Sequence, residues 1–313
     1  MTQLGDPELP DAALPTRSPA LARGQILLAT ILWSTSGIFS KSPWFEIWPV
    51  EERGLQLAFW RAAFAGCALL PFVKKISWPP LLGLAALCFA AMNTSFLMAM
   101  TMTTAANAIW LQYAAPAWVF LVGVGLLGER ARSADYLMLV FAVLGVGWIA
   151  FGEWSHATTM DHHVLGSLLG VASGIAFAGV VLCVRGLRGH DSAWVISVCL
   201  LTSALVLLPY VIGKGNWPNP KVMTGLALFG ASQLALPYIL FAWGTREVTS
   251  HEASFITLLE PLLVPVWVWL VWGGRPEYEF PASWTLVGGG LILTGLVIRF
   301  IRLWNAPPLP PGR

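Results

Sequence analysis

The chain has 313 residues, of which 57% are hydrophobic and only 11% are charged, whereas roughly a quarter of an ordinary soluble domain is charged. So small a charged fraction excludes a soluble protein, and a net charge of +2 without a basic run excludes a nucleic-acid-binding protein. The four cysteines stand singly within apolar segments, which predicts small buried side chains and neither a metal site nor a disulfide.

Apolar stretches long enough to cross a bilayer follow one another along almost the whole chain. A helix of about 20 residues, rising about 1.5 Å per residue, spans the hydrocarbon core. Residues 1–22 carry acids and prolines and predict a disordered tail, as does the Pro-rich end, 304–313. The predicted helices occupy 24–41, 55–73, 79–100, 104–127, 133–152, 166–184, 193–213, 221–244, 250–272 and 282–303. The sequence therefore predicts an all-α polytopic membrane protein with ten transmembrane helices.

The distribution of basic residues orients these helices. Lys and Arg are more frequent in the loops on the side of the two chain ends, for example Lys74, Lys75, Arg130 and Arg132. Under the positive-inside rule both termini are predicted to be cytoplasmic, in a multi-pass protein of a cell inner membrane.

The second half of the sequence repeats the first. A constant offset aligns Thr104 with Thr249 and Pro116 with Pro261. Because five helices is an odd number, a second copy must cross the membrane in the opposite sense, which predicts inverted repeats around a midplane site. A purely structural duplication is the alternative. Since one chain holds both orientations, we expect a monomer. The predicted repeats are 23–153 and 164–303.

Several motifs resemble those of the EamA-type drug/metabolite transporters. They are "LAFWRAAFAGCALLPF" at 57–72, "LQYAAPAWVFLVGVGLLGE" at 111–129, "LLEPLLVPVWVWLVWGG" at 258–274 and "VGGGLILTGLVI" at 287–298. The resemblance covers about 24–303. It implies a ten-helix transporter with cytoplasmic termini, and among family members it is closest to the YddG-type exporters of aromatic amino acids.

Two prolines predict helix breaks. Pro116 and Pro261 each remove a backbone hydrogen bond in the middle of an apolar helix, which is tolerated where the broken backbone lines a cavity. The helices at 104–127 and 250–272 are therefore predicted to meet beside a shared pocket, although a packing kink is the alternative.

Two ionisable side chains fall within predicted spans. Glu260 stands in the middle of its helix, where an unpaired charge costs at least about 2.5 to 3.5 kcal/mol, so we expect it to be neutral, paired or in a wet cavity. It is the one candidate for a proton-coupling group. Arg61 is predicted near the outer end of its helix, where its stem snorkels or its head is paired; contact with an anionic substrate is the alternative.

Polar and aromatic side chains complete the predicted pocket. The run "WSTSG" at 33–37 is interpreted as cavity-lining, because exposing its polar side chains to lipid costs free energy. Aromatic rings predicted deep in the membrane suggest a pocket wall that would contact a flat apolar side chain of the substrate. Core packing is the alternative for each ring. The candidate substrate-binding residues are Trp33, Ser36, Asn93, Asn107, Trp110, Phe177, Tyr238, Thr257 and Glu260.

Other patterns are interpreted as structural. Gly166, Gly170, Gly174 and Ala178 recur every four residues and predict a flat face for helix packing, with a cavity-facing sliding surface as the alternative. One external loop gathers histidines and an acid that favour a solvated loop over a metal site: His156, Asp161, His162 and His163.

These features predict a secondary transporter that exports aromatic and other neutral amino acids by alternating access. A multidrug exporter, or an exporter of threonine, cysteine or homoserine, is the alternative. No nucleophile, acid pair or ligand set within the spans favours an enzyme, no ring of like residues favours a channel, and we expect no cofactor.

Overall fold

The computed structural model describes residues 19–129, 131–156 and 162–304, and within these ranges the chain is helical and has no strand. Nine helical segments there are long and apolar enough to cross a membrane. The segment at the start of the chain is not among these nine; it is interrupted at Thr35 and consists of α1 (Pro19–Ser34) and α2 (Ser36–Ser40). The all-helical fold is confirmed, and nine of the ten predicted membrane helices are long and apolar enough to cross a bilayer.

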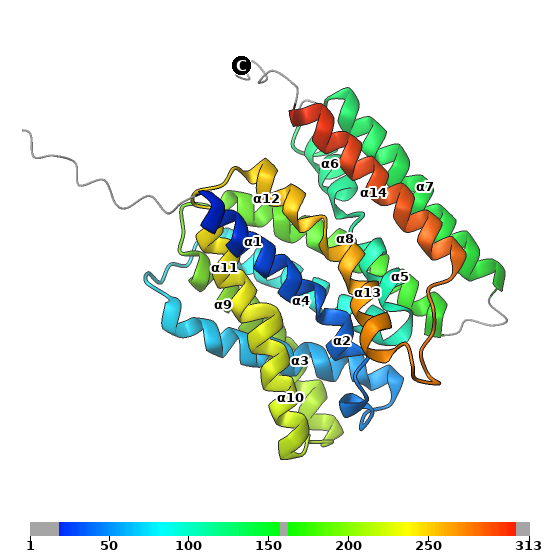
Figure 1. The fold of residues 1–313 in the computed structure, drawn as a ribbon. Coiled ribbons are helices and arrows are strands. Elements are labelled where there is room, and N and C mark those ends of the chain that lie inside the picture. The colour runs from blue at the N-terminus through cyan, green and yellow to red at the C-terminus, as the bar shows by residue number, and fades with distance from the viewer. Residues whose placement is uncertain (1–18, 130, 157–161, 305–313) are drawn as a thin grey trace, which may run out of the picture.

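Figure 1 shows the helices packed side by side in one bundle, and they are described here in chain order as the two halves of the sequence repeat. After α1 and α2, the first half comprises α3 (Val50–Leu69), α4 (Pro80–Met102), α5 (Ala105–Gln112) continued by α6 (Ala115–Gly125), and α7 (Ser133–His156). The second comprises α8 (His162–Gly186), α9 (Ser192–Lys214), α10 (Pro220–Gly230) joined through the π-turn η3 (Ala231–Ala235) to α11 (Leu236–Gly244), α12 (Ser250–Thr257) continued by α13 (Glu260–Trp272), and α14 (Ser283–Trp304). Short 3₁₀ turns are η1 (Pro43–Phe45) and η2 (Leu70–Phe72).

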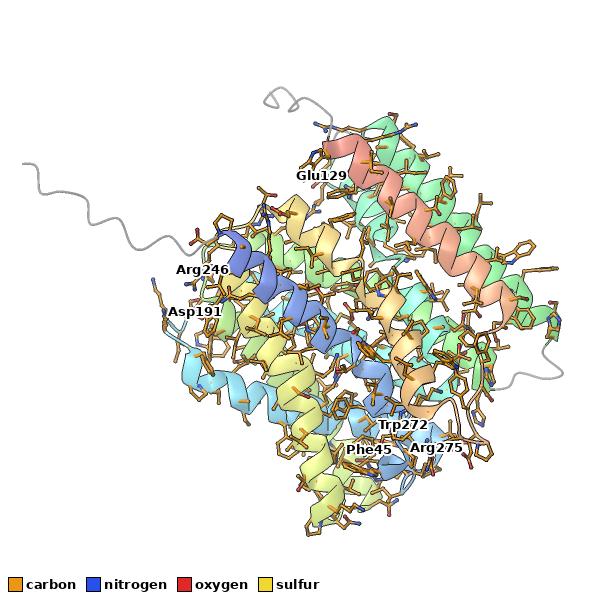
Figure 2. The ribbon with its side chains drawn as sticks, viewed as in Figure 1. Phe45, Glu129, Asp191, Arg246, Trp272 and Arg275 are labelled. Atoms are coloured by element: carbon orange, nitrogen blue, oxygen red, sulfur yellow. The ribbon has the colours of Figure 1, made fainter. Side chains whose placement is uncertain are left out.

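The two ends of the bundle are named here by their chain segments. The terminal face is the end at which α1 begins and α14 ends; the distal face is the opposite end, which carries loops 41–49, 215–219 and 273–282. Figure 2 shows Glu129 and Arg246 toward the terminal face, and Trp272 and Arg275 at the distal face.

Three predicted helix starts are wrong by several residues, including that of α8, which begins at His162 and not at 166. Helix α1 begins at Pro19, inside the predicted tail 1–22, while residues 1–18 and 305–313 lie outside the described part. Helix α3 begins at Val50 and not at 55, because Pro49 precedes it and two acids in its first turn favour the positive end of the helix dipole.

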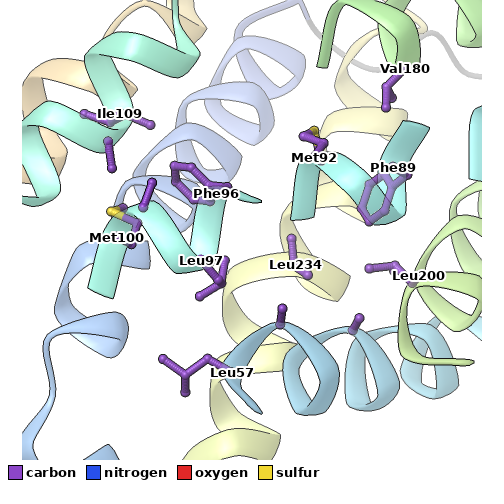
Figure 3. Packing of buried hydrophobic residues seen from close by; sticks show 14 of the residues in the cluster. Leu57, Phe89, Met92, Phe96, Leu97, Met100, Ile109, Val180, Leu200 and Leu234 are labelled. Atoms are coloured by element: carbon purple, nitrogen blue, oxygen red, sulfur yellow. The ribbon is translucent and has the colours of Figure 1, made fainter. Parts of the chain in front are cut away.

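The packing of the helices follows a two-fold pattern. Helix α4 packs along α8, and its repeat counterpart α11 packs along α1; α3 packs on its own counterpart α9, α7 on α14, and α5 on α13. Each contact therefore either has an equivalent in the other half or joins two equivalent helices. The halves interlock around one centre, and Figure 3 shows part of the apolar packing there, with Phe89 and Met92 of α4 near Leu200 of α9 and Leu234 of η3.

The two proline breaks occupy equivalent places in the repeats. Thr104 caps α5 by accepting a hydrogen bond from the backbone N–H of Asn107 at 3.2 Å, and Thr249 caps α12 in the same way from Glu252 at 3.3 Å. Each short helix then ends after eight residues, and the next begins with the proline at its second position. The predicted pair of breaks is thus observed.

The glycine stripe on α8 is a packing face. A Cβ at Gly174 would lie 3.0 Å from the carbonyl oxygen of Leu111 and 3.2 Å from that of Gln112. We therefore expect Gly174→Leu to lower the free energy of unfolding by about 1–3 kcal/mol, because α8 would be forced away from α5. Thermal unfolding in detergent measures this. Gly147→Leu is the matched control, since no atom lies within 4 Å of its Cβ position; equal melting temperatures for both variants would contradict the packing interpretation.

Asp191 joins the start of α9 to the segment that precedes α4 (Figure 2). Its carboxylate accepts hydrogen bonds from the backbone N–H groups of Trp194 at 3.1 Å, Lys74 at 2.9 Å and Lys75 at 3.1 Å. Burial raises the pKa of Asp191, but these donors outweigh it and hold the pKa below its ordinary value.

A depressed folded-state pKa stabilises the protein above the unfolded-state pKa, and this stability is lost as the pH falls through the folded value. Asp191→Ala is therefore expected to cost about 1 kcal/mol at neutral pH and progressively less below about pH 4. Melting temperatures across a pH series test this, and a pH-independent difference would contradict it.

Candidate functional site

Arg61 lies in the middle of α3 and is 3% exposed. Its Nη1 donates a hydrogen bond to Oε1 of Gln233 at 2.8 Å, its Nη2 donates to Oδ1 of Asn93, and its guanidinium lies 5.2 Å from the centre of the Phe229 ring. The prediction that Arg61 snorkels to the outer end of its helix is wrong, because α3 starts earlier than expected and places it three turns deep. The head group is instead held by hydrogen bonds to two neutral amide oxygens.

Gln233 reaches Arg61 from the π-turn η3. Pro237 follows four residues later and has no N–H for the carbonyl of Gln233, so the helix widens here by one residue. The amide of Gln233 also donates to the backbone oxygen of Trp33 at 3.2 Å, next to the break between α1 and α2. Sequence reasoning did not single out Gln233; its signal is a polar residue one turn before a mid-helix proline.

Tyr113 and Glu260 join the two proline breaks. The hydroxyl of Tyr113 lies 2.8 Å from Oε2 of Glu260 and 3.0 Å from the carbonyl oxygen of Thr257. That carbonyl has lost its helical donor, since the residue four positions later is Pro261. The predicted meeting of these helices is therefore built around one phenol group.

The hydrogen bonds at this contact depend on whether Glu260 is protonated. A phenol carries one hydrogen, which serves one of its two acceptors when Glu260 is a carboxylate. When Glu260 is protonated, it donates to the oxygen of Tyr113, and Tyr113 donates to the carbonyl of Thr257. Protonation of Glu260 thus completes the hydrogen bonds of the α12–α13 break.

Opposite charges and aromatic rings surround the same centre. Arg61 and Glu260 interact electrostatically with each other and with Tyr238, but no ion pair within 4 Å joins the two charges in the part of the chain that the structure describes. Trp33 packs edge-on against Tyr238, with ring centres 5.4 Å apart, and against Phe241 at 5.2 Å. We call this group the central cluster: Trp33, Arg61, Asn93, Tyr113, Gln233, Tyr238, Thr257 and Glu260.

Asn107 belongs to a different group, near the distal face. Its side-chain amide lies 3.0 Å from Oε1 of Glu153 and 2.7 Å from Oγ of Ser167, and its oxygen accepts from Thr285 at 3.4 Å. Glu153 stands inside α7, which continues to His156 and does not end at the predicted 152.

These side chains adjoin a pocket of about 260 Å³ at the distal face. Its lining includes Glu153, His156 and His163. No group of three or more metal-ligating side chains occurs among the described residues, and Asp161 of the predicted histidine loop lies outside them.

The remaining predicted residues lie apart from the central cluster. Trp110 is buried against Gly289 of α14, and its indole N–H has no partner among the described residues. Ser36 is buried with an unpartnered hydroxyl, and Phe177 packs half-buried against the core. Five of the nine predicted substrate-binding residues are thus brought together by the fold: Trp33, Asn93, Tyr238, Thr257 and Glu260.

The central cluster is closed on its distal side by α2 and α13. The indole of Trp272 donates to the carbonyl oxygen of Ile38 at 3.0 Å, and that of Trp267 donates to the hydroxyl of Ser34 at 2.9 Å. Gly37 allows the two helices to approach, since a Cβ there would lie 3.1 Å from Cγ1 of Val264. The terminal side carries a different contact, between α1 and α12, which is the ion pair of Arg23 with Glu252 at 2.5 Å.

Comparison with known protein families identifies the family of this chain. The model of the EamA-like transporter family matches residues 23–151 and again residues 164–301. This chain belongs to the EamA-like transporter family. The resemblance expected from the sequence motifs is confirmed at the level of the family, and the chain is a multi-pass membrane transporter.

Individual relatives differ in what they carry. An uncharacterized transporter of Archaeoglobus fulgidus is 28% identical, over 88% of this chain and 94% of its own. The pseudopaline exporter CntI of Pseudomonas aeruginosa is 26% identical over 61% of this chain and 64% of its own, and a biotin transporter of Salmonella typhimurium is 31% identical over 34% and 36%. A solved crystal structure, 18% identical, covers 92% of this chain and 100% of its own with a TM-score of 0.60, which shows a shared fold.

Proposed function

We propose that this transporter exports aromatic and other neutral amino acids across a cell inner membrane by alternating access. The observation that carries the proposal is the central cluster, which holds a buried cation, Arg61, and a half-buried acid, Glu260, with no ion pair between them within 4 Å in the described part of the chain. A zwitterionic amino acid carries the complementary pair of charges. The rings of Trp33 and Tyr238 offer an apolar wall for its side chain.

The repeat architecture supports the proposed mechanism. Equivalent breaks beside one centre, with α1–α12 contacts on the terminal side and α2–α13 contacts on the distal side, suit two alternating gates. The proposed terminal side is the cytoplasm, and one chain is proposed to work as a monomer. Export is supported by the exporter among the relatives and by the resemblance to YddG-type exporters.

Transport assays with purified protein in lipid vesicles test this proposal. Labelled phenylalanine, tryptophan and threonine, biotin and an organic cation are measured side by side, with vesicles lacking the protein as the blank. We expect phenylalanine and tryptophan to move fastest. Equal rates for all amino acids would remove the aromatic preference, and transport of the organic cation alone would favour the multidrug alternative.

A further inference from the structure

We propose that Arg61 binds the carboxylate group of the cargo and thereby sets a preference for carboxylic acids over otherwise identical neutral compounds. This deepens the proposed function and rests on it for the choice of amino acids as first probes. The role belongs to Arg61 together with two amides that hold it, Asn93 and Gln233.

The guanidinium of Arg61 has unused hydrogen-bonding capacity. It carries five N–H donors and a positive charge. Two donors are occupied, both by neutral amide oxygens, and Nε is buried without a partner among the described residues. An unpaired donor on a buried cation is costly, and a carboxylate accepts from Nε and a neighbouring Nη side by side.

The charge of Arg61 also lacks a contact partner, unlike other arginines of the helical bundle. Arg23 pairs with Glu252 at 2.5 Å and Arg299 pairs with Asp135 at 2.7 Å, both near the terminal face. No carboxylate lies within 4 Å of Arg61 in the described ranges. A cation at this depth is expensive in a membrane, and intramembrane ionisable residues of this kind mark substrate pathways.

The surroundings hold the guanidinium in one orientation. The amide of Asn93 donates to the carbonyl of Ala58 at 3.1 Å and to the hydroxyl of Ser203 at 2.9 Å, so its oxygen is turned toward Arg61. The amide of Gln233 donates to the carbonyl of Trp33, which turns its oxygen toward Arg61 in the same way. Donors that are fixed before the ligand arrives cost less ordering on binding.

Paired probes that differ in the carboxylate alone test this role. The affinity of the purified protein for phenylalanine is compared with that for phenylalaninamide, and that for biotin with that for biotin amide, by tryptophan fluorescence and thermal stabilisation. We expect at least one acid to bind about tenfold to a hundredfold more tightly than its amide, the range expected for charge-assisted hydrogen bonds.

Substitutions then assign the preference to Arg61. Arg61→Gln is expected to reduce the acid-to-amide ratio to about one while leaving amide binding within about twofold; Arg61→Lys keeps the charge without the planar fork and is expected to fall between. Arg53→Gln is the matched control, on the same helix, where Arg53 donates to the carbonyl of Trp48 at 3.2 Å. Amide binding reports folding, and a purely structural role would weaken acid and amide alike.

The outcomes separate this inference from the proposed function. Equal binding of acids and amides by the wild-type protein overturns the role of Arg61, and this result does not depend on whether the variants fold. An acid-to-amide affinity ratio that is unchanged in Arg61→Gln overturns it as well. If phenylalanine is not transported but biotin binds in an Arg61-dependent way, the role stands and the proposed amino acid cargo is wrong. If phenylalanine is transported and the acid-to-amide ratio does not depend on Arg61, the proposed amino acid cargo stands and the role of Arg61 is wrong.

Discussion

Glu260→Gln is expected to abolish any stimulation of transport by a pH gradient while exchange of cargo without a gradient continues. The amide nitrogen of glutamine donates to the oxygen of Tyr113, so this hydroxyl still serves the carbonyl of Thr257. The variant therefore mimics the protonated state and has no proton to release. Uptake into vesicles with and without an imposed pH gradient measures the effect.

The control for this experiment is Glu247→Gln, an exposed acid in the loop before α12. Its gradient dependence is expected to match that of the wild-type protein. If Glu260→Gln retains full gradient dependence, Glu260 is not the coupling group and another acid carries the proton. If the wild-type protein shows no gradient dependence, transport is facilitated diffusion.

Gly37→Val is expected to slow exchange transport at least about tenfold by preventing closure of the distal side. A Cβ at Gly37 would lie 2.5 Å from Cγ2 of Val268 and 3.4 Å from the Cβ of Ala105, so α2 and α13 must separate. Overpacking of a close helix contact costs about 1–3 kcal/mol, enough to shift an equilibrium between two gates by about tenfold or more.

Two readouts distinguish a shifted gate from a damaged protein. A cysteine introduced at Ser40, which is fully buried, is expected to react with a membrane-impermeant thiol reagent from the distal side only when Gly37 is replaced. Gly24→Val on α1 is the control, since no atom lies within 4 Å of its Cβ position. Normal exchange and an unreactive cysteine in Gly37→Val would show that this contact is not part of a gate.

Features that depend on local chemistry were predictable from the sequence. Pro116 and Pro261 break their helices as expected, because a missing N–H and a ring clash act within one turn. Thr104 and Thr249 cap the helices that begin directly after them, α5 and α12, for the same local reason. The meeting of the two broken helices followed from applying the repeat symmetry to these breaks, but the residue of the first helix that contacts Glu260 is Tyr113, which was not among the candidate residues.

Other features required knowledge of neighbouring helices. Arg61 was placed too near the membrane surface because the charged start of α3 reads as a loop until Pro49 and the first-turn acids are recognised as a helix start. Asn107 was assigned to the same pocket as Glu260, but its amide is held by Glu153 and Ser167 from α7 and α8. Both partners lie on other helices, far from Asn107 in the sequence, so no helical periodicity indicates that they contact it.

The sequence by itself determined the ten apolar helices, the inverted repeat, the two breaks and the family, because hydropathy, proline chemistry and repeat alignment act along the chain. The tertiary structure decided which polar groups share a centre. Arg61, Asn93, Gln233 and Glu260 come from four different membrane-spanning segments, and their hydrogen bonds depend on helix rotation and on the π-turn that aims Gln233. Such contacts depend on how segments that are distant in the sequence pack together, and a local sequence pattern does not predict that geometry.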